Sequence, residues 1–158
     1  MVKIKQQGLF ERMRKTVQRA TKTVFPTPVR EYRMLSESDY FRLQAILSKG
    51  LKELGTTEAR HARRIRQLLK HGFLFACKRI PYSVVTMNSQ VQLRSLRGTR
   101  FVVTLVYPQD ADRKQRKISV LSPLGMSLLG RAVGQSLSRN LVIEKMIYQP
   151  EIAGDFHL

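Results

Sequence analysis

The sequence predicts an α+β protein in which an antiparallel helical hairpin precedes an antiparallel sheet with one short helix. Apolar residues recur at helical spacing from Tyr40 to Ala76 and are interrupted at Gly55. Beyond Pro81 they alternate as in half-buried strands. Helices followed by strands indicate an α+β fold. We therefore divide the chain into a basic extension, the hairpin and the sheet domain, at residues 1–30, 31–80 and 81–158.

The extension, residues 1–30, has apolar side chains at helical spacing with basic side chains between them. One interpretation is a basic amphipathic helix that binds lipid, nucleic acid or a partner. The other is a solvated tail, which we favour because an isolated helix of this length is marginal in water. Pro26 and Pro28 then form a stiff linker to the rest of the chain.

Two helices are expected in the hairpin. Ser36 is suited to cap the first, and Asp39 completes an approximate capping box. The apolar pattern predicts this helix over residues 37–54, which corresponds to about 27 Å, with Gly55 as the C′ residue. A second helix follows, and its apolar face reaches Ala76. The short connection predicts that the two helices lie antiparallel, as a short coiled coil.

The sheet domain is expected to contain several short strands and one helix. Ser122 and Pro123 end one strand, and an apolar helical turn follows from Leu124 to Gly130. We expect the tail over residues 150–158 to be polar and only partly ordered. The strands are predicted over residues 84–87, 91–96, 101–107, 118–121, 135–137 and 141–148.

The charge of the chain is strongly positive. Its 158 residues include 29 Lys and Arg against 11 Asp and Glu, which gives a net charge of +18. Such a charge attracts polyanions, so nucleic acid, acidic protein surfaces and anionic lipid are all candidate partners. Cys77 is the single cysteine, which excludes an internal disulfide and fits a reducing cytoplasm. The sequence predicts no membrane span and no secretory signal.

A cluster of basic residues lies on the second predicted helix. No acidic residue occurs between Ala59 and Gln109, which exceeds what solubility requires. The cluster is either a contact surface for acidic protein or nucleic acid, or a solvated helix face. We call it the basic face; it consists of Arg60, Arg63, Arg64, Arg66 and Lys70.

The stretch from Lys117 to Gly134 combines a strand, a proline stop, a short helix and two glycines. It resembles the signature of the bacterial Gre transcript-cleavage factors. The residues that carry the resemblance are Ser122, Pro123, Leu124, Gly125, Leu128, Leu129, Gly130 and Gly134.

Three further motifs are similar to one branch of that family, the Rnk proteins, named as regulators of nucleoside diphosphate kinase. They are V-V-T-M-N-S at residues 84–89, T-L-V-Y-P at 104–108, and Y-Q-P-E at 148–151 with A-G-D at 153–155. The turn at residues 138–140 is shorter than the Pro-Gly-Gly loop usual in that branch. Residues 1–30 resemble nothing known to us.

The resemblance implies a sheet domain like that of the FK506-binding proteins (FKBP-like) and a coiled-coil-like hairpin. It also implies a partner, bacterial RNA polymerase, bound at the mouth of its secondary channel. Docking would involve Leu121, Ser122 and Pro123. The relatives commonly have a polar or acidic residue before Ser-Pro, so Leu121 predicts altered docking.

Gre factors place two carboxylates at the hairpin tip, where they help to hold a second Mg²⁺ in the polymerase. The candidates here are Glu53 and Glu58. Their separation does not reproduce the family's D-x-x-E tip, and Glu58 is explained by the dipole of the second helix. Because part of the hairpin must pack on the sheet, its free arm is short. We therefore expect a polymerase-binding regulator that does not stimulate cleavage.

Other chemistry is not indicated by the sequence. The histidines have no metal-ligand spacing with Cys77, and no catalytic triad or phosphate loop is present. An FKBP-like fold does not imply prolyl isomerase activity. We expect a monomer without cofactor or enzymatic activity. The alternatives are a Gre-type cleavage and elongation factor, and a basic protein that binds nucleic acid non-specifically.

Overall fold

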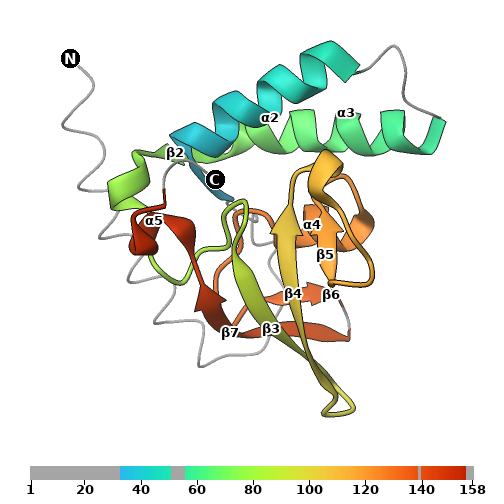
Figure 1. Cartoon of the computed structure of the whole chain (residues 1–158), viewed down its shortest axis with the longest axis vertical. Helices are drawn as coiled ribbons and strands as arrows, with labels where there is room; N and C mark the ends of the chain where they lie inside the picture. Colours follow the sequence, from blue (N-terminus) through green and yellow to red (C-terminus); the bar gives the residue numbers. More distant parts are fainter. Residues whose placement is uncertain (1–32, 51–55, 139, 156–158) are drawn as a thin grey trace, which may run out of the picture. The chain divides into compact units, whose positions relative to one another are not determined.

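The computed structural model describes residues 33–50, 56–138 and 140–155, all within one compact unit, Tyr32–Leu158. The predicted extension over residues 1–30 lies outside the described residues. The described part is a mixed α+β fold (Figure 1). Its elements, in order, are β1 (Met34–Ser36), α2 (Glu37–Gly50), α3 (Thr56–His71), β2 (Phe73–Phe75), η1 (Cys77–Arg79), β3 (Gln90–Ser95), β4 (Arg100–Val106), η2 (Pro108–Asp110), β5 (Lys117–Ser119), α4 (Pro123–Leu128), β6 (Ser136–Ser138), β7 (Leu141–Tyr148) and α5 (Pro150–Ala153).

The main sheet has the strand order β5-β4-β3-β7-β6. Its central strand, β3, pairs antiparallel with both β4 and β7. The prediction of a wholly antiparallel sheet is wrong at one edge, because β5 pairs parallel with β4. The loop before β5 turns back on itself at Arg116, where φ is +56°. The chain therefore enters β5 in the same direction as β4.

A second, two-stranded sheet was not predicted. β1 and β2 pair parallel, with Met34 opposite Phe73. The second helix was expected to reach Ala76, but α3 ends at His71 and the chain enters β2 after Gly72. At Gly72 a Cβ would lie 2.6 Å from Leu35 Cδ1, so a side chain at this position would have to displace the Leu35 side chain of β1.

α2 and α3 lie alongside one another and run in opposite directions (Figure 1). We call these two helices the arm. The tip of the arm, residues 51–55, lies outside the described residues, so the predicted end of the first helix at residue 54 remains a prediction. The side chains that pack the arm are almost fully buried; they include Leu43, Leu47, Ala62, Ile65 and Leu69.

One hydrophobic core joins the arm to the sheet. Ile65 of α3, Leu93 of β3 and Leu128 of α4 each expose 0% of their surface and belong to the same buried cluster. Full burial of such a side chain stabilises the fold by roughly 1.5–3 kcal/mol. The base of the arm is therefore part of the packed core.

Three other predicted elements change in the structure. Residues 84–87 form no strand, only one bridge between Val84 and Ala132, because a turn follows at once with Asn88 at φ +62°. The strand expected over residues 118–121 is β5 and ends at Ser119. The polar tail contains a helix, α5, with Pro150 in its first turn and Gly154 as a left-handed cap. The strand expected over residues 141–148 is confirmed as β7.

Candidate functional site

The predicted docking corner is built at the start of α4. Ser122 is the N-cap, and its Oγ accepts a hydrogen bond from the Gly125 backbone N–H at 3.0 Å. Pro123 occupies the first helical turn, where its missing N–H costs nothing. Ser122 is half-buried and Pro123 is exposed. The corner therefore presents a rigid proline at the surface.

Leu121 does not share that exposure. Its side chain is 9% exposed and belongs to the hydrophobic core. Its backbone N–H donates to Ser119 Oγ at 3.1 Å. A partner that approaches Pro123 would not meet the Leu121 side chain, so the apolar residue at this position has a sufficient packing role. The docking role of the three residues remains a prediction.

Two glycines allow the corner to pack closely against the neighbouring backbone. A Cβ on Gly125 would lie 2.1 Å from the Ser119 carbonyl oxygen, which no side chain tolerates. Gly130 has φ +73°, and a Cβ there would lie 2.8 Å from the Met34 carbonyl oxygen. Arg33 completes this contact, because its Nη1 donates to the carbonyl oxygens of Ser127 and Leu129 at 2.8 Å each. The corner is thus the point where β1, and through it the arm, joins α4.

The predicted tip residues cannot be compared with the structure in full. Glu53 lies outside the described residues, and Glu58 belongs to the first turn of α3. Whether the two carboxylates act together stays a prediction.

The predicted basic face is solvent-exposed on α3. Arg66 crosses to α2 and donates from Nη2 to the Leu47 carbonyl oxygen at 3.1 Å. The exposed members of the face are Arg60, Arg63, Arg64, Arg66 and Lys70. The face is available to a polyanionic partner.

A polar cluster that the sequence did not predict lies between the arm and the sheet. Asp39 of α2 is 6% exposed. Its Oδ2 accepts the Met87 backbone N–H at 2.9 Å, and its Oδ1 accepts the Tyr107 hydroxyl at 3.4 Å. Burial, followed by repulsion from Glu151, raises the pKa of Asp39 from 3.8 to about 6. Burial and the nearby Asp39 charge also raise the pKa of Tyr107.

Hydroxyl groups extend this cluster towards α5. Thr86 Oγ1 donates to Glu151 Oε2 at 2.7 Å and lies 2.9 Å from Ser89 Oγ. Because the single proton of Thr86 points to the carboxylate, the Ser89 hydroxyl donates to Thr86. Ser89 Oγ also accepts the Thr86 backbone N–H at 3.1 Å. Each buried hydroxyl is therefore satisfied.

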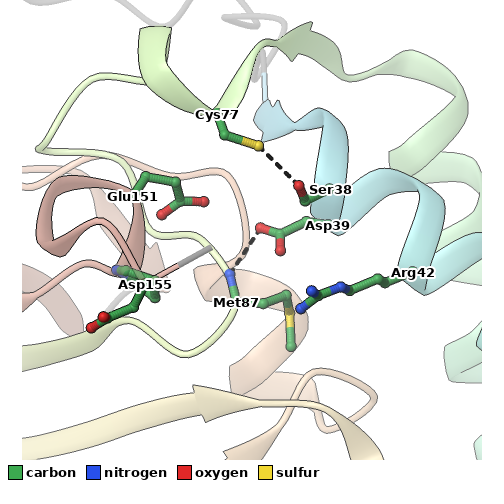
Figure 2. A pocket seen from close by; sticks show the side chains of 8 residues that line it. Ser38, Asp39, Arg42, Cys77, Met87, Glu151 and Asp155 are labelled. Atoms are coloured by element: carbon green, nitrogen blue, oxygen red, sulfur yellow. Dashed lines mark hydrogen bonds between the residues drawn. The ribbon is translucent and has the colours of Figure 1, made fainter. Parts of the chain in front are cut away.

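A small cavity of about 20 Å³ lies at the centre of the cluster. Figure 2 shows Asp39 and Glu151 on opposite sides of it, one from α2 and the other from α5. Cys77 of η1 also lines it and lies 2.9 Å from Ser38 Oγ. Arg42, Met87, Pro150 and Asp155 complete the lining.

The three motifs outside the corner converge on this cluster. The first supplies Thr86, Met87 and Ser89, the second supplies Tyr107, and the third supplies Glu151. Gln149 of the third motif donates from Nε2 to the Val84 carbonyl oxygen at 2.8 Å. The motifs are thus explained by the junction that they build.

Sequence reasoning assigned Asp39 to a helix cap. Ser36 does cap α2, because its Oγ accepts the Asp39 backbone N–H at 3.2 Å. The Asp39 carboxylate, however, is engaged by residues far along the chain. The sequence contained a signal of this buried role. Asp39 lies on the apolar face of α2, one turn before Leu43 and two turns before Leu47. A carboxylate in that row predicts a buried polar partner.

Within the described residues, no group of three His, Cys, Asp or Glu side chains could hold a metal ion. No helix in the same residues has the length and apolar character that crossing a membrane requires.

Residues 80–149 match the family model for the C-terminal part of the transcription elongation factors GreA and GreB. The chain is similar to the regulator of nucleoside diphosphate kinase of Escherichia coli K12, with 41% identity over 88 residues. This match covers 50% of the chain and 65% of the relative. The transcription elongation factor GreA of Prosthecochloris aestuarii is 36% identical over 75 residues, which cover 46% of the chain and 47% of that protein.

One solved structure is similar over a larger share of the chain. It is a prokaryotic transcription elongation factor GreA/GreB from Nitrosomonas europaea, with 30% identity and a TM-score of 0.64. The match covers 73% of the chain and 99% of that structure. The chain and that factor thus share a similar fold over more residues than the family model matches.

Proposed function

Because the chain belongs to the GreA/GreB family, we propose that it is a transcription regulator that binds bacterial RNA polymerase at the mouth of the secondary channel. In this proposal it does not stimulate RNA cleavage and has no cofactor or enzymatic activity of its own. It acts as a monomer in the bacterial cytoplasm. Residues 81–158 form an FKBP-like domain, and residues 31–80 form a short coiled-coil hairpin.

The docking corner carries the proposal. The family match over residues 80–149 includes the whole corner. Pro123 is exposed there, while the Ser122 cap fixes the backbone on which it stands. A rigid, exposed apolar side chain loses little conformational freedom on binding. This supports Pro123 as the centre of the polymerase contact.

The short arm supports the absence of cleavage activity. Within the described residues α2 contains 14 residues, which correspond to about 21 Å of helix. Its base is fixed by the hydrogen bond from the Met87 N–H to Asp39 and by that from the Met34 N–H to the Gly130 carbonyl oxygen, so the free length is smaller still. Glu53 and Glu58 would have to reach the polymerase active centre from this arm. We propose that they stop short of it.

The basic face supports a second candidate function, non-specific binding of nucleic acid. Five exposed cations on one helix give a surface of the kind that releases counterions from a phosphate backbone. The same surface suits an acidic rim of the polymerase. The salt dependence of binding to RNA distinguishes binding of nucleic acid from binding of an acidic polymerase surface.

The cleavage question is answered with backtracked transcription complexes. Purified protein is added to complexes that a cleavage-active Gre factor shortens in a parallel reaction. The proposal predicts that the transcript keeps its length. Shortening that is lost in Glu53→Ala and Glu58→Ala would instead identify a cleavage factor.

A further inference from the structure

Helix α4 carries the docking corner at one end and is too short to keep its shape alone. It contains six residues, Pro123–Leu128, which make less than about two turns. Isolated helices shorter than about 12–15 residues are marginal in water. At its N-terminal end the Ser122 hydroxyl accepts the Gly125 N–H at 3.0 Å. The backbone at Pro123 therefore also depends on what holds the C-terminal end.

Arg33 holds the C-terminal end of α4 from outside the helix. Its Nη1 donates to the Ser127 and Leu129 carbonyl oxygens at 2.8 Å each, across 94 and 96 residues of sequence. Carbonyl groups at the end of a helix have no partner within it, so a basic side chain that binds them acts as a cap. Arg33 is half-buried, and hydrogen bonds from charged donors are stronger than neutral ones. The short helix is thus capped at both ends.

Backbone hydrogen bonds next to Arg33 join the same end of α4 to the arm. The Met34 N–H donates to the Gly130 carbonyl oxygen at 3.1 Å, and the Gly130 N–H donates to the Val85 carbonyl oxygen at 2.8 Å. The residues that follow α4 are therefore held between β1 and the loop before β3. Because β1 leads directly into α2, Arg33 and Met34 connect the base of the arm to the helix of the docking corner.

We propose that Arg33 is a positioning residue for the docking corner. It closes α4 at the end opposite to Ser122 and thereby fixes the backbone at Pro123, which it does not contact itself. This role rests on the proposed polymerase contact at Pro123. It adds that the strength of this contact is set by a residue at the base of the arm. Loosening of β1 from α4 would then weaken docking although every docking residue is unchanged.

Amide hydrogen exchange of the full chain, followed by NMR for single residues, tests this role in the free protein. Arg33→Met removes the donor and keeps an unbranched side chain. The Leu129 amide reports on the end that Arg33 caps, and the Gly125 amide reports on the end that Ser122 caps. Because a hydrogen bond to a charged group is strong and so short a helix opens as a unit, protection of both amides should fall by about tenfold or more. A fall at Leu129 alone would overturn the positioning role.

Two controls in the turn between β3 and β4 separate this effect from global stability and from charge. Gly98→Ala strains the backbone at φ +86° without a clash, so it lowers stability and leaves α4 intact. Arg97→Met removes one exposed positive charge. Both variants should keep the protection of the Gly125 amide. An equal loss at Gly125 in Gly98→Ala and Arg33→Met would overturn the role, because the effect would then be global.

Two further substitutions at the same position complete the exchange experiment. Arg33→Lys retains a cationic donor that can serve two carbonyl oxygens, so it should recover most of the protection. Arg33→Gln replaces Arg33→Met if that variant does not fold, and it should show the loss at Gly125. Full protection in Arg33→Gln together with loss in Arg33→Lys would contradict a cap that depends on a charged donor.

Titration of labelled protein with core RNA polymerase measures the consequence for docking. Apparent affinity scales with the fraction of molecules in the competent conformation, so Arg33→Met should bind about threefold more weakly. Arg33→Lys and Arg97→Met should bind as the wild type does. Equal affinities of Arg33→Met and a binding wild type would overturn the positioning role. Absence of wild-type binding would instead contradict the proposed function, whereas the exchange experiment does not involve the polymerase.

Discussion

The Asp39 carboxylate lies 2.9 Å from the Met87 backbone nitrogen, across the junction between the first turn of α2 and the loop before β3. This hydrogen bond spans 48 residues of sequence. It ties an ionisable side chain of the arm to the backbone of the sheet. The stability of the junction therefore depends on the charge of one buried residue.

The first prediction concerns the pH dependence of stability. The folded state raises the pKa of Asp39 from 3.8 to about 6, so it binds the proton more tightly than the unfolded chain. The free energy of unfolding should therefore fall as the pH rises between these values, by on the order of 3 kcal/mol, and then level off. Asp39→Asn should lack this fall. Urea unfolding of both proteins at a series of pH values measures the difference.

Other carboxyls, such as Glu144, titrate in both proteins and cancel in the comparison. The assignment to Asp39 is wrong if the wild type and Asp39→Asn show the same dependence on pH. It is also wrong if the wild type gains stability over this range relative to the variant.

The second prediction concerns the contact between β1 and the docking corner. Gly130→Ala adds a Cβ at 2.8 Å from the Met34 carbonyl oxygen, at φ +73°. Gly98→Ala has a similar φ, +86°, but no atom within 4 Å of its Cβ. Strain at positive φ costs both variants about 1 kcal/mol, and the clash adds about 1–3 kcal/mol at Gly130. Urea unfolding should rank Gly130→Ala as the less stable. Equal losses would mean that β1 does not pack closely on the corner.

The third prediction concerns the buried hydroxyl of Thr86. Thr86→Val keeps the shape of the side chain but removes both the donor to Glu151 and the acceptor of the Ser89 hydroxyl proton. Unsatisfied buried groups cost about 1–3 kcal/mol. Thr104→Val is the control, because its hydroxyl accepts only a long hydrogen bond of 3.5 Å from Gln90. Chemical unfolding should show a clear loss for the first variant and little for the second. A loss confined to Thr104→Val would contradict the directed chain of hydroxyls.

The fourth prediction concerns the basic face. If it binds nucleic acid, replacing Arg60, Arg63, Arg64 and Lys70 by Gln should flatten the salt dependence of binding to single-stranded RNA. The slope of log K against log salt should fall by about 0.7 for each phosphate that the variant no longer neutralises. A control variant with the same net charge has four other exposed cations replaced by Gln. They are Lys78, Arg79, Arg113 and Lys114. Equal slopes for the two variants would assign the effect to net charge alone.

The sequence predicted those parts of the fold that depend on local pattern. The apolar rows of α2 and α3, and the alternation of β7, repeat over enough residues to be recognised. β1 and β2 are three residues each and are defined only by their mutual pairing. α5 had recognisable signals in Pro150 and Gly154, but a helix of four residues has too few apolar positions for a period.

The site was predictable to a smaller extent. The corner could be found because Ser122, Pro123 and the glycines lie close together in the sequence. The burial of Leu121 could not be predicted from the sequence, because it depends on the core beneath α4. Asp39 was assigned to a cap since its partners, Met87 and Tyr107, lie 48 and 68 residues away. Only the folded chain brings these three residues together.

The most direct test of the account is the affinity of the full chain for core RNA polymerase, measured by titration of labelled protein. The wild type should bind, and Pro123→Ala should bind about tenfold more weakly, which corresponds to about 1.4 kcal/mol. Leu96→Ala, at an exposed apolar position in the turn between β3 and β4, should bind as the wild type does. Absence of wild-type binding, or equal affinity of Pro123→Ala and the wild type, would contradict the account.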